Sequence, residues 1–159
     1  ELPGQGLTIA TPNPVYLRGD FNTQNEIPAA ILCDALTLLS NAWDGTKALG
    51  QISAADDTTY NAAILTGFMQ SEPGAGYSGG VGNMVRFLEH WYFDECTVKG
   101  SFVALGESQY ARAPYKSLGV YTEPNRSWSF NESFNDPDKL PPFTPMIAKV
   151  GRLIYTDID

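Results

Sequence analysis

The stretch Gly6–Asn22, GLTIATPNPVYLRGDFN, contains two short apolar runs that turn residues separate and end. Leu7–Ala10 and Val15–Leu17 hold four and three residues, and Thr11–Pro14 breaks the chain between them. Proline and asparagine at such positions favour a turn, because proline fixes φ and asparagine hydrogen-bonds its own backbone. The pattern predicts brief β-strands in which each strand forms one side of a coil.

Comparable segments recur along the rest of the chain, flanked by Gly, Pro, Asn and Asp. Some of them, such as Ala29–Cys33, are apolar without alternation, which is typical of strands buried on both faces. The expected strands are Leu7–Ala10, Pro14–Phe21, Ala29–Ser40, Tyr60–Phe68, Cys96–Leu105, Val120–Thr122, Ser127–Phe130 and Met146–Thr156.

Two segments carry helical periodicity. Ala29–Leu39 fits a helix as well as a strand, and we favour the strand because Pro28 precedes it and the run is short. In the segment 81–91, apolar residues recur at i, i+3, i+4, i+7 and i+10, which predicts an amphipathic α-helix with His90 on its polar side. The apolar positions of that helix are Val81, Met84, Val85, Leu88 and Trp91.

Short strands that cannot bury their faces alone must stack on one another. A loose echo between PAAIL (Pro28–Leu32) and NAAIL (Asn61–Leu65) fits such stacking, although no strict repeat is present. The expected fold is mainly β: a short right-handed parallel β-helix (β-solenoid) with one packed α-helix around 81–91. At 159 residues, a single domain over 1–159 is the simplest organisation.

The charge and composition exclude several partners. The formal net charge of −8 and the scattering of the ten Lys and Arg residues argue against nucleic acid and against an anionic membrane surface. The longest apolar stretch, near Ala29–Leu39, is interrupted by Asp34 and is too short to insert into a membrane. A charged fraction of only 18% favours an extracellular or cell-surface protein.

The two cysteines, Cys33 and Cys96, are too few for a metal site of their own and too far apart for a CxxC motif. A disulfide between them would close a long loop and would stabilise the fold by about 4 kcal/mol. The alternative is a pair of buried free thiols.

Several blocks of the sequence resemble a known bacterial segment. LTIATPNPVYLRGDFN, AILCDALTLLSNAW, NAAILTG, YSGGVGNMVRFLEHW, GSFVALGESQYA and RSWSFNESFNDPDKLPPFTPM are similar, in this order, to a segment near the C-terminus of large surface or secreted proteins. Those proteins are associated with type IV pilus assembly (PilX-like) or are prepilin-type. The resemblance covers about Leu7 to Met146, implies the end of a right-handed parallel β-helix, and brings no catalytic residues. Family members are typically longer, so the chain is expected to be a processed C-terminal piece or a short stand-alone subunit.

No catalytic, cofactor-binding or metal-binding residues are expected. His90 is the only histidine, and no serine lies in a G-x-S-x-G motif. Parallel β-helices often carry polysaccharide hydrolases or lyases, and glycosidic cleavage needs two facing carboxylates. The close carboxylates here, at 56–57, 94–95 and 136–138, fall in expected turns and are read as solvated charges.

Two further sets of residues are candidates for binding or modification. Trp43, Trp128 and Tyr121 would form an aromatic face that stacks on sugars or proteins, or would instead cover the end of the core. Asn125 and Asn131 each begin an N-glycosylation sequon, a weak signal in a bacterial chain.

The expected function is an extracellular structural or interaction module. It would be a subunit or terminal domain of a bacterial surface filament or pilus-associated protein, assembling with itself or with other surface subunits through exposed solenoid ends. The alternative is a carbohydrate-active enzyme or carbohydrate-binding domain on a β-helix face, with glycans as partners.

Overall fold

A computed structural model describes residues 2–47, 51–67, 84–111 and 121–146. These residues are mainly β-strand, and no α-helix occurs among them. Two short 3₁₀ helices, η2 (Glu132–Asn135) and η3 (Pro137–Lys139), follow the last strand. The strands are β1 (Leu7–Ala10), β2 (Val15–Arg18), β3 (Ala29–Cys33), β4 (Leu36–Leu39), β5 (Thr58–Thr66), β6 (Val85–Phe87), β7 (Glu95–Ala104) and β8 (Asn125–Phe130).

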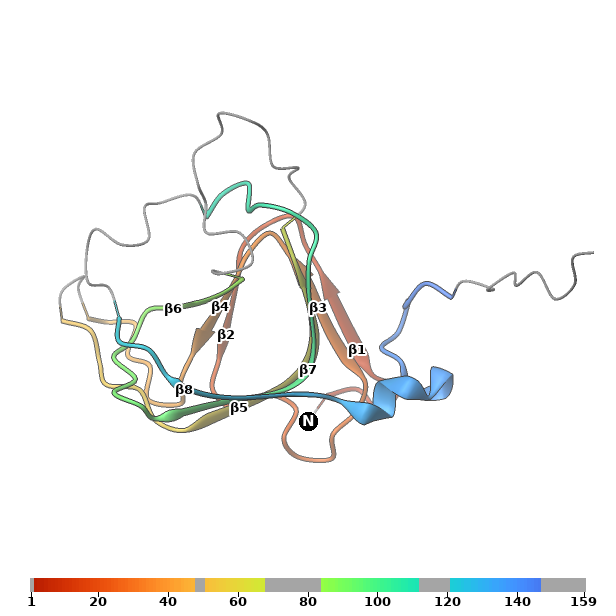
Figure 1. The fold of residues 1–159 in the computed structure, drawn as a ribbon, viewed down its shortest axis with the longest axis horizontal. Helices are drawn as coiled ribbons and strands as arrows, with labels where there is room; N and C mark the ends of the chain where they lie inside the picture. Colours follow the sequence, from red (N-terminus) through yellow and green to blue (C-terminus); the bar gives the residue numbers. More distant parts are fainter. Residues whose placement is uncertain (1, 48–50, 68–83, 112–120, 147–159) are drawn as a thin grey trace, which may run out of the picture.

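The strands form two sheets in which every pair is parallel (Figure 1). The larger sheet has the order β1-β3-β5-β7-β8 and the smaller one the order β2-β4-β6. From β1 to β7 the chain therefore visits the two sheets in turn. A parallel pair needs a crossover connection, and from β1 to β7 each crossover between neighbours of one sheet contains a strand of the other.

Isolated parallel bridges continue the same order beyond the named strands. Phe21 pairs with Tyr60, and His90 pairs with both Ala54 and Thr122. In Figure 1 the strands consequently lie along the sides of a three-sided outline, with β2, β4 and β6 on one side, β1 and β3 on another, and β5 and β8 along the base. The core lies inside this outline.

The interior is built by side chains that repeat at matching register positions. Ile9, Ile31 and Ile64 occupy one such column, which Phe102 extends on β7. In the smaller sheet Leu17, Leu38 and Phe87 form a second column. Ile31, Leu38 and Ile64 are at most 1% exposed, so like side chains stack on like across neighbouring strands.

The extended conformation expected over Ala29–Ser40 is confirmed, whereas the single strand and the helical alternative are wrong. The segment forms β3 and β4 with a bend at Asp34 between them. In β3 the inward side chains Ala29, Ile31 and Cys33 are nearly inaccessible, whereas Leu32 on the opposite face is half-buried. The apolar pattern that also fits a helix arises because both faces of these strands are covered.

The α-helix expected around 81–91 is wrong for residues 84–91. Residues 81–83 lie outside the described part of the chain, and Val85–Phe87 is strand β6. Val85, Phe87, Glu89 and Trp91 are buried while the residues between them are half-buried, which is the period of a strand. Glu89 conceals that period in the sequence, because a carboxylate is expected on a solvent face, whereas this one is buried.

The remaining expected strands are confirmed at β1, β2, β5, β7 and β8 with small changes in their bounds. Thr122 contributes a single bridge, and Met146 is not in a strand. The residues after Met146 that were expected to form the last strand lie outside the described residues. The segment Ser71–Gly80, whose glycine and proline residues predict a loop, also lies outside the described residues.

A disulfide between Cys33 and Cys96, one of the two states expected for these cysteines, is not formed. Both cysteines are free and buried. Cys33 pairs in register with Thr66 and Cys96 with Thr58, at opposite ends of the nine-residue strand β5. At about 3.3 Å per residue this separation far exceeds the limit for a disulfide, about 7 Å between Cα atoms.

Because both cysteines are buried, their thiols should resist chemical modification in the folded protein. Burial raises the pKa of the Cys33 thiol to about 11 and that of Cys96 to about 12. We expect the folded protein to react slowly with a thiol-specific chromogenic disulfide at about pH 8. In denaturant both thiols should react at once without reductant. Slow reaction in denaturant that becomes fast only after reduction would contradict the structure.

Gly100 marks the closest approach of two strands. It pairs with Ala62, and a Cβ atom added at Gly100 would lie 1.7 Å from the Ala62 carbonyl oxygen. We expect Gly100→Ala to lower the free energy of unfolding by about 3 kcal/mol or more, since a backbone atom must move.

Gly4→Ala is the matched control, because a Cβ there meets nothing within 4 Å. Urea denaturation of the two variants measures the difference. Equal stability of both variants would contradict the close approach at Gly100.

Candidate functional site: an exposed edge strand beside an apolar groove

Strand β8 is an open edge of the larger sheet. All six of its residues are exposed, and among the described residues β8 pairs only with β7. The N–H groups of Asn125 and Asn131 donate to the Asp94 and Gly100 carbonyls. Because backbone groups of a strand alternate in direction, the N–H and C=O groups at Arg126, Trp128 and Phe130 point away from β7. They present the hydrogen-bonding edge that a further strand would need.

Aromatic and cationic side chains cover the core beside this edge. Arg126 pairs in register with Cys96, and Trp128 with Val98, whose side chains are both fully buried. Trp128 is 40% exposed and stacks on Phe102 with ring centroids 4.9 Å apart. The Arg126 guanidinium lies over the Trp128 and Phe87 rings at 5.4 and 5.9 Å, a cation–π arrangement.

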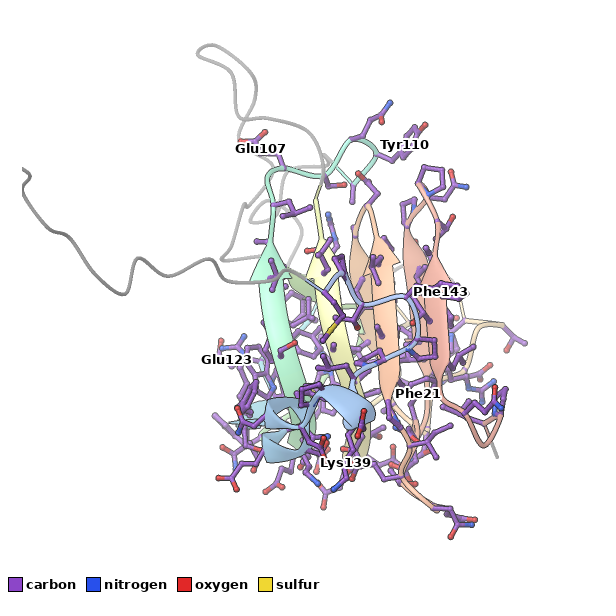
Figure 2. All side chains as sticks on the ribbon, turned by 90° about the vertical axis from the view of Figure 1, so that its right-hand side faces the viewer. Phe21, Glu107, Tyr110, Glu123, Lys139 and Phe143 are labelled. Atoms are coloured by element: carbon purple, nitrogen blue, oxygen red, sulfur yellow. The ribbon has the colours of Figure 1, made fainter. Side chains whose placement is uncertain are left out.

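Residues 131–145 form an arm that leaves β8 and returns across the outer face of the larger sheet to β1 (Figure 2). The Thr8 hydroxyl donates to the Pro142 carbonyl at 2.6 Å. Gly6 allows this approach: its φ is +97°, and a Cβ there would lie 2.9 Å from the Pro142 ring. In Figure 2 Lys139 and Phe143 lie on this arm in front of the strands.

An apolar groove of about 330 Å³ lies between the arm and the sheet. Its floor includes the outward residues Ala30, Ala63 and Ser101 at neighbouring positions, whose small side chains leave this space open. Phe143, 95% exposed, and Phe130, 53% exposed, stand at its wall. Phe130 belongs to both features, so the groove begins where the open edge of β8 ends. A volume of this size is within the range of small-ligand and side-chain pockets.

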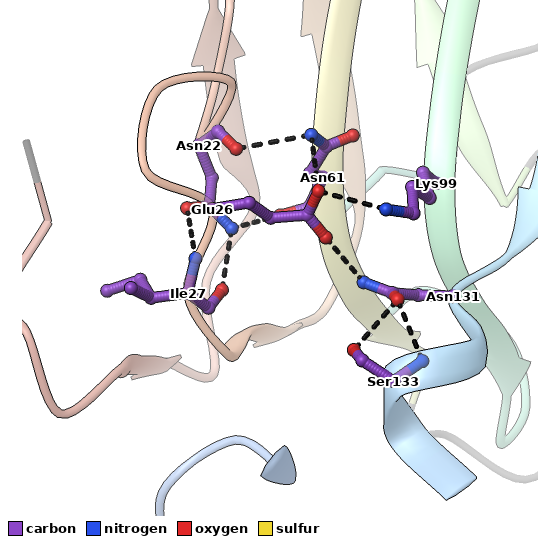
Figure 3. A network of polar contacts seen from close by, with 7 residues as sticks. All are labelled: Asn22, Glu26, Ile27, Asn61, Lys99, Asn131 and Ser133. Carbon is purple, nitrogen blue, oxygen red and sulfur yellow. Dashed lines mark hydrogen bonds and ion pairs between the residues drawn. The ribbon is translucent and has the colours of Figure 1, made fainter.

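A polar network fixes the start of the arm (Figure 3). Glu26 lies at its centre: Oε1 accepts from Asn131 Nδ2 at 2.7 Å, and Oε2 accepts from Lys99 Nζ at 3.0 Å. Asn61 Nδ2 lies 3.4 Å from the same Oε2. Asn131 is 5% exposed, and its Oδ1 accepts from the backbone N and the hydroxyl of Ser133.

Asn22 anchors the loop that carries Glu26. Its side chain accepts from the Ile27 N–H and donates to the carbonyls of Ile27 and Asn61. Its φ of +58° is a left-handed conformation that asparagine tolerates better than most residues. Contacts in this network join residues up to 105 positions apart, so no local sequence pattern reveals it.

Two buried carboxylates were also missed from the sequence. Glu89, 0% exposed, accepts from Ser40 N and Ser40 Oγ, both at 2.7 Å. Burial raises the pKa of Glu89, and the two hydrogen bonds from Ser40 oppose that rise. Asp34 is 1% exposed and accepts from Ser108 Oγ and from the backbone N–H groups of Gln109 and Tyr110. Each of these carboxylates ties together chain segments that are distant in sequence.

The three residues of the expected aromatic face lie in different parts of the chain and have different surroundings. Trp128 lies on the open edge, whereas Tyr121 is half-buried and packs on Phe87 with centroids 5.8 Å apart. Trp43 lies in the turn after β4, where its backbone N–H donates to the Ser40 carbonyl. The ring contacts around Phe87 and Trp128 do not include Trp43.

Carboxylates of the three close sets accept hydrogen bonds from backbone N–H groups. Asp57 accepts from the Glu95 N–H at 2.7 Å, and Asp56 accepts from the Ala42 N–H at 3.0 Å. Asp136 caps η3 through the Asp138 N–H. Within the described ranges, no three His, Cys, Asp or Glu side chains gather as metal ligands. His90 lies in a backbone ladder, and its buried Nδ1 has no hydrogen-bond partner.

The two sequons differ in access. Asn125 is exposed at the start of β8, where a glycan could be carried. The amide of Asn131 is buried and fully engaged by Glu26 and Ser133, so the folded chain does not offer it to a glycosyl donor.

Comparison with protein-family models, with curated proteins and with solved structures finds no match to this chain. None of the helices in the described part of the chain is long and apolar enough to cross a bilayer.

Glu89→Gln tests the buried carboxylate. Because burial raises the folded-state pKa, ionisation of Glu89 opposes folding. The stabilising contribution of the neutral acid is present below the unfolded-state pKa, about 4.3, and is lost as the pH rises through the folded-state pKa. We expect Glu89→Gln to unfold at higher urea than the parent protein at about pH 7 and at the same urea at about pH 4.

The exposed carboxyl Glu123 supplies the control variant, Glu123→Gln. A Glu89→Gln protein that loses stability at neutral pH, relative to the parent, would show that the hydrogen bonds from Ser40 outweigh the burial cost.

Proposed function

We propose that this chain is a short right-handed parallel β-solenoid and acts as an extracellular structural or interaction module. Two features support the solenoid: every strand pair in the described part of the chain is parallel, and from β1 to β7 successive strands alternate between the two sheets. The columns of like side chains across β1, β3, β5 and β7 support it too, because stacked coils bury matching positions against each other.

The observation that carries the functional proposal is the open edge of β8. Within the described part of the chain, its outward N–H and C=O groups are free to pair with a further strand. The exposed side chains of Trp128 and Phe130 lie on the same strand, and Phe130 also lines the apolar groove. An added strand would gain backbone hydrogen bonds along β8, and its side chains would gain apolar contacts with Trp128 and Phe130. The partner is therefore an extended segment of another surface subunit, either a second copy of this chain or a different protein.

Arg126 makes this edge selective. An inward-pointing charge on an edge strand discourages indiscriminate strand pairing, because a purely apolar partner would bury it without compensation. A matching partner brings a carboxylate or an aromatic ring to the guanidinium. This requirement fits ordered assembly better than aggregation.

The resemblance of the sequence blocks to pilus-associated segments agrees with such a role. On this proposal the chain is a subunit or terminal domain of a bacterial surface filament or pilus-associated protein. The alternative, a carbohydrate-active or carbohydrate-binding domain, has less support. Its carboxylates at Asp56, Asp57 and Asp136 are engaged with backbone N–H groups, and Tyr121 is half-buried against Phe87.

Trp128→Ala tests the edge. We expect the parent protein to form larger species as its concentration rises, followed by sedimentation velocity and negative-stain microscopy. Loss of the Trp128 ring should weaken that assembly about tenfold, since an aromatic contact of this kind is worth about 1 to 2 kcal/mol.

Tyr110→Ala is the matched control, because Tyr110 is 57% exposed and lies in a loop away from β8. It should assemble like the parent. A parent protein that stays monomeric at every concentration, alone and with its natural surface subunits, would refute the proposal.

A further inference from the structure

Lys99, Glu26 and Asn131 come from three different parts of the chain and meet through one carboxylate (Figure 3). Lys99 lies on β7, Glu26 in the loop before β3, and Asn131 at the start of the arm. The two Glu26 oxygens are divided between them, with the amine of Lys99 on Oε2 at 3.0 Å and the amide nitrogen of Asn131 on Oε1 at 2.7 Å. A carboxylate between an amine and a primary amide is the arrangement that amide exchange requires.

We propose that Lys99 and Asn131 form an intramolecular isopeptide bond with Glu26 as the proton carrier. The Lys99 Nζ attacks the Asn131 Cγ, the new Nζ–Cγ bond forms, and the Cγ–Nδ2 bond breaks. The products are a secondary amide that links the two side chains and one molecule of ammonia. The reaction needs no oxidant, cofactor or second substrate.

The Asn131 amide is prepared for attack at its carbonyl. Its Oδ1 accepts from the Ser133 N–H at 3.1 Å and from the Ser133 hydroxyl at 2.8 Å. Two donors on one carbonyl oxygen stabilise the negative charge that develops on it in a tetrahedral intermediate. Asn131 is 5% exposed, so these donors act where competition from water is small.

Glu26 is placed to serve both ends of the reaction. Attack requires the neutral amine, and Oε2 is within hydrogen-bonding reach to take a proton from Lys99. Oε1 faces the departing nitrogen, to which the carboxyl group returns the proton as ammonia leaves. One carboxylate can therefore act first as a base and then as an acid.

Asn61 is the competing amide, and its geometry is less suitable. Its Nδ2 lies 3.4 Å from Glu26 Oε2, but its buried Oδ1 has no hydrogen-bond donor. Without a donor the carbonyl of Asn61 cannot stabilise the developing charge as Asn131 can. The geometry therefore selects Asn131.

The exposure of the ion pair predicts a slow reaction. The Lys99 and Glu26 side chains are 45% and 30% exposed, so water competes for both groups, and only the neutral amine can attack the amide. The linked fraction should rise with time and should rise faster in alkaline buffer. Once formed, the bond would tie the arm covalently to β7.

Intact-mass measurement of the denatured protein, before and after long incubation at about pH 9, tests the proposal. We expect a species lighter than the sequence mass by one ammonia, and a branched peptide joining the Lys99 and Asn131 fragments after proteolysis. Lys99→Arg, Glu26→Gln and Asn131→Ala should each abolish both signals. Lys47→Arg, which changes an exposed lysine outside the network, should leave both unchanged.

Circular dichroism establishes that each variant is folded, and the parent protein alone can refute the proposal. A parent that keeps its full sequence mass after alkaline incubation overturns it. Loss of ammonia without a branched peptide indicates asparagine cyclisation and also overturns it. A branch to Asn61 in place of Asn131 overturns the assignment of the reacting amide.

Discussion

Parallel pairing between strands that occupy equivalent places along the chain is the constraint on which the rest of this structure depends. It sets Ile31 beside Ile64 and Leu38 beside Phe87, so that each strand seals the interior faces of its neighbours. The same pairing brings Gly100 against the Ala62 carbonyl, where no larger residue fits. Since backbone and side-chain register are coupled, a shift of one residue would turn every core side chain to the wrong face.

The proposed function depends on β8, the last strand of the larger sheet. Interior strands satisfy their backbone on both sides, whereas β8 does so only towards β7 among the described residues. The side chains there differ from those of the core, with Arg126 held over aromatic rings where inner strands carry aliphatic or small residues. The arm then crosses the outer face of the larger sheet, and the apolar groove lies between the arm and that face. Edge and groove share Phe130, and the proposed strand-like partner would contact both.

Polar side chains act in this fold as long-range connectors. Glu89 is held by Ser40, Asp34 holds the segment from Ser108 to Tyr110, and Glu26 joins β7 to the arm. A buried carboxylate is tolerated when donors surround it, and these donors are largely backbone N–H and hydroxyl groups. At Glu26 the partners are an amine and an amide, and this difference in chemistry makes that network a candidate for covalent bond formation.

The sequence by itself determined most of the extended segments, because short apolar runs bounded by turn residues have few other stable conformations. Strand β1 matches the expected Leu7–Ala10, and β3 and β4 both lie within the expected Ala29–Ser40, although the break between them was not expected. It failed at 84–91, where helical and strand periods both fit and an inward Glu89 hid the alternation. Only the tertiary structure decided that Cys33 and Cys96 lie apart and that Glu26 meets Lys99 and Asn131. Local composition specifies which residues extend, but the register between distant strands specifies which side chains touch, and that register is a property of the whole packed chain.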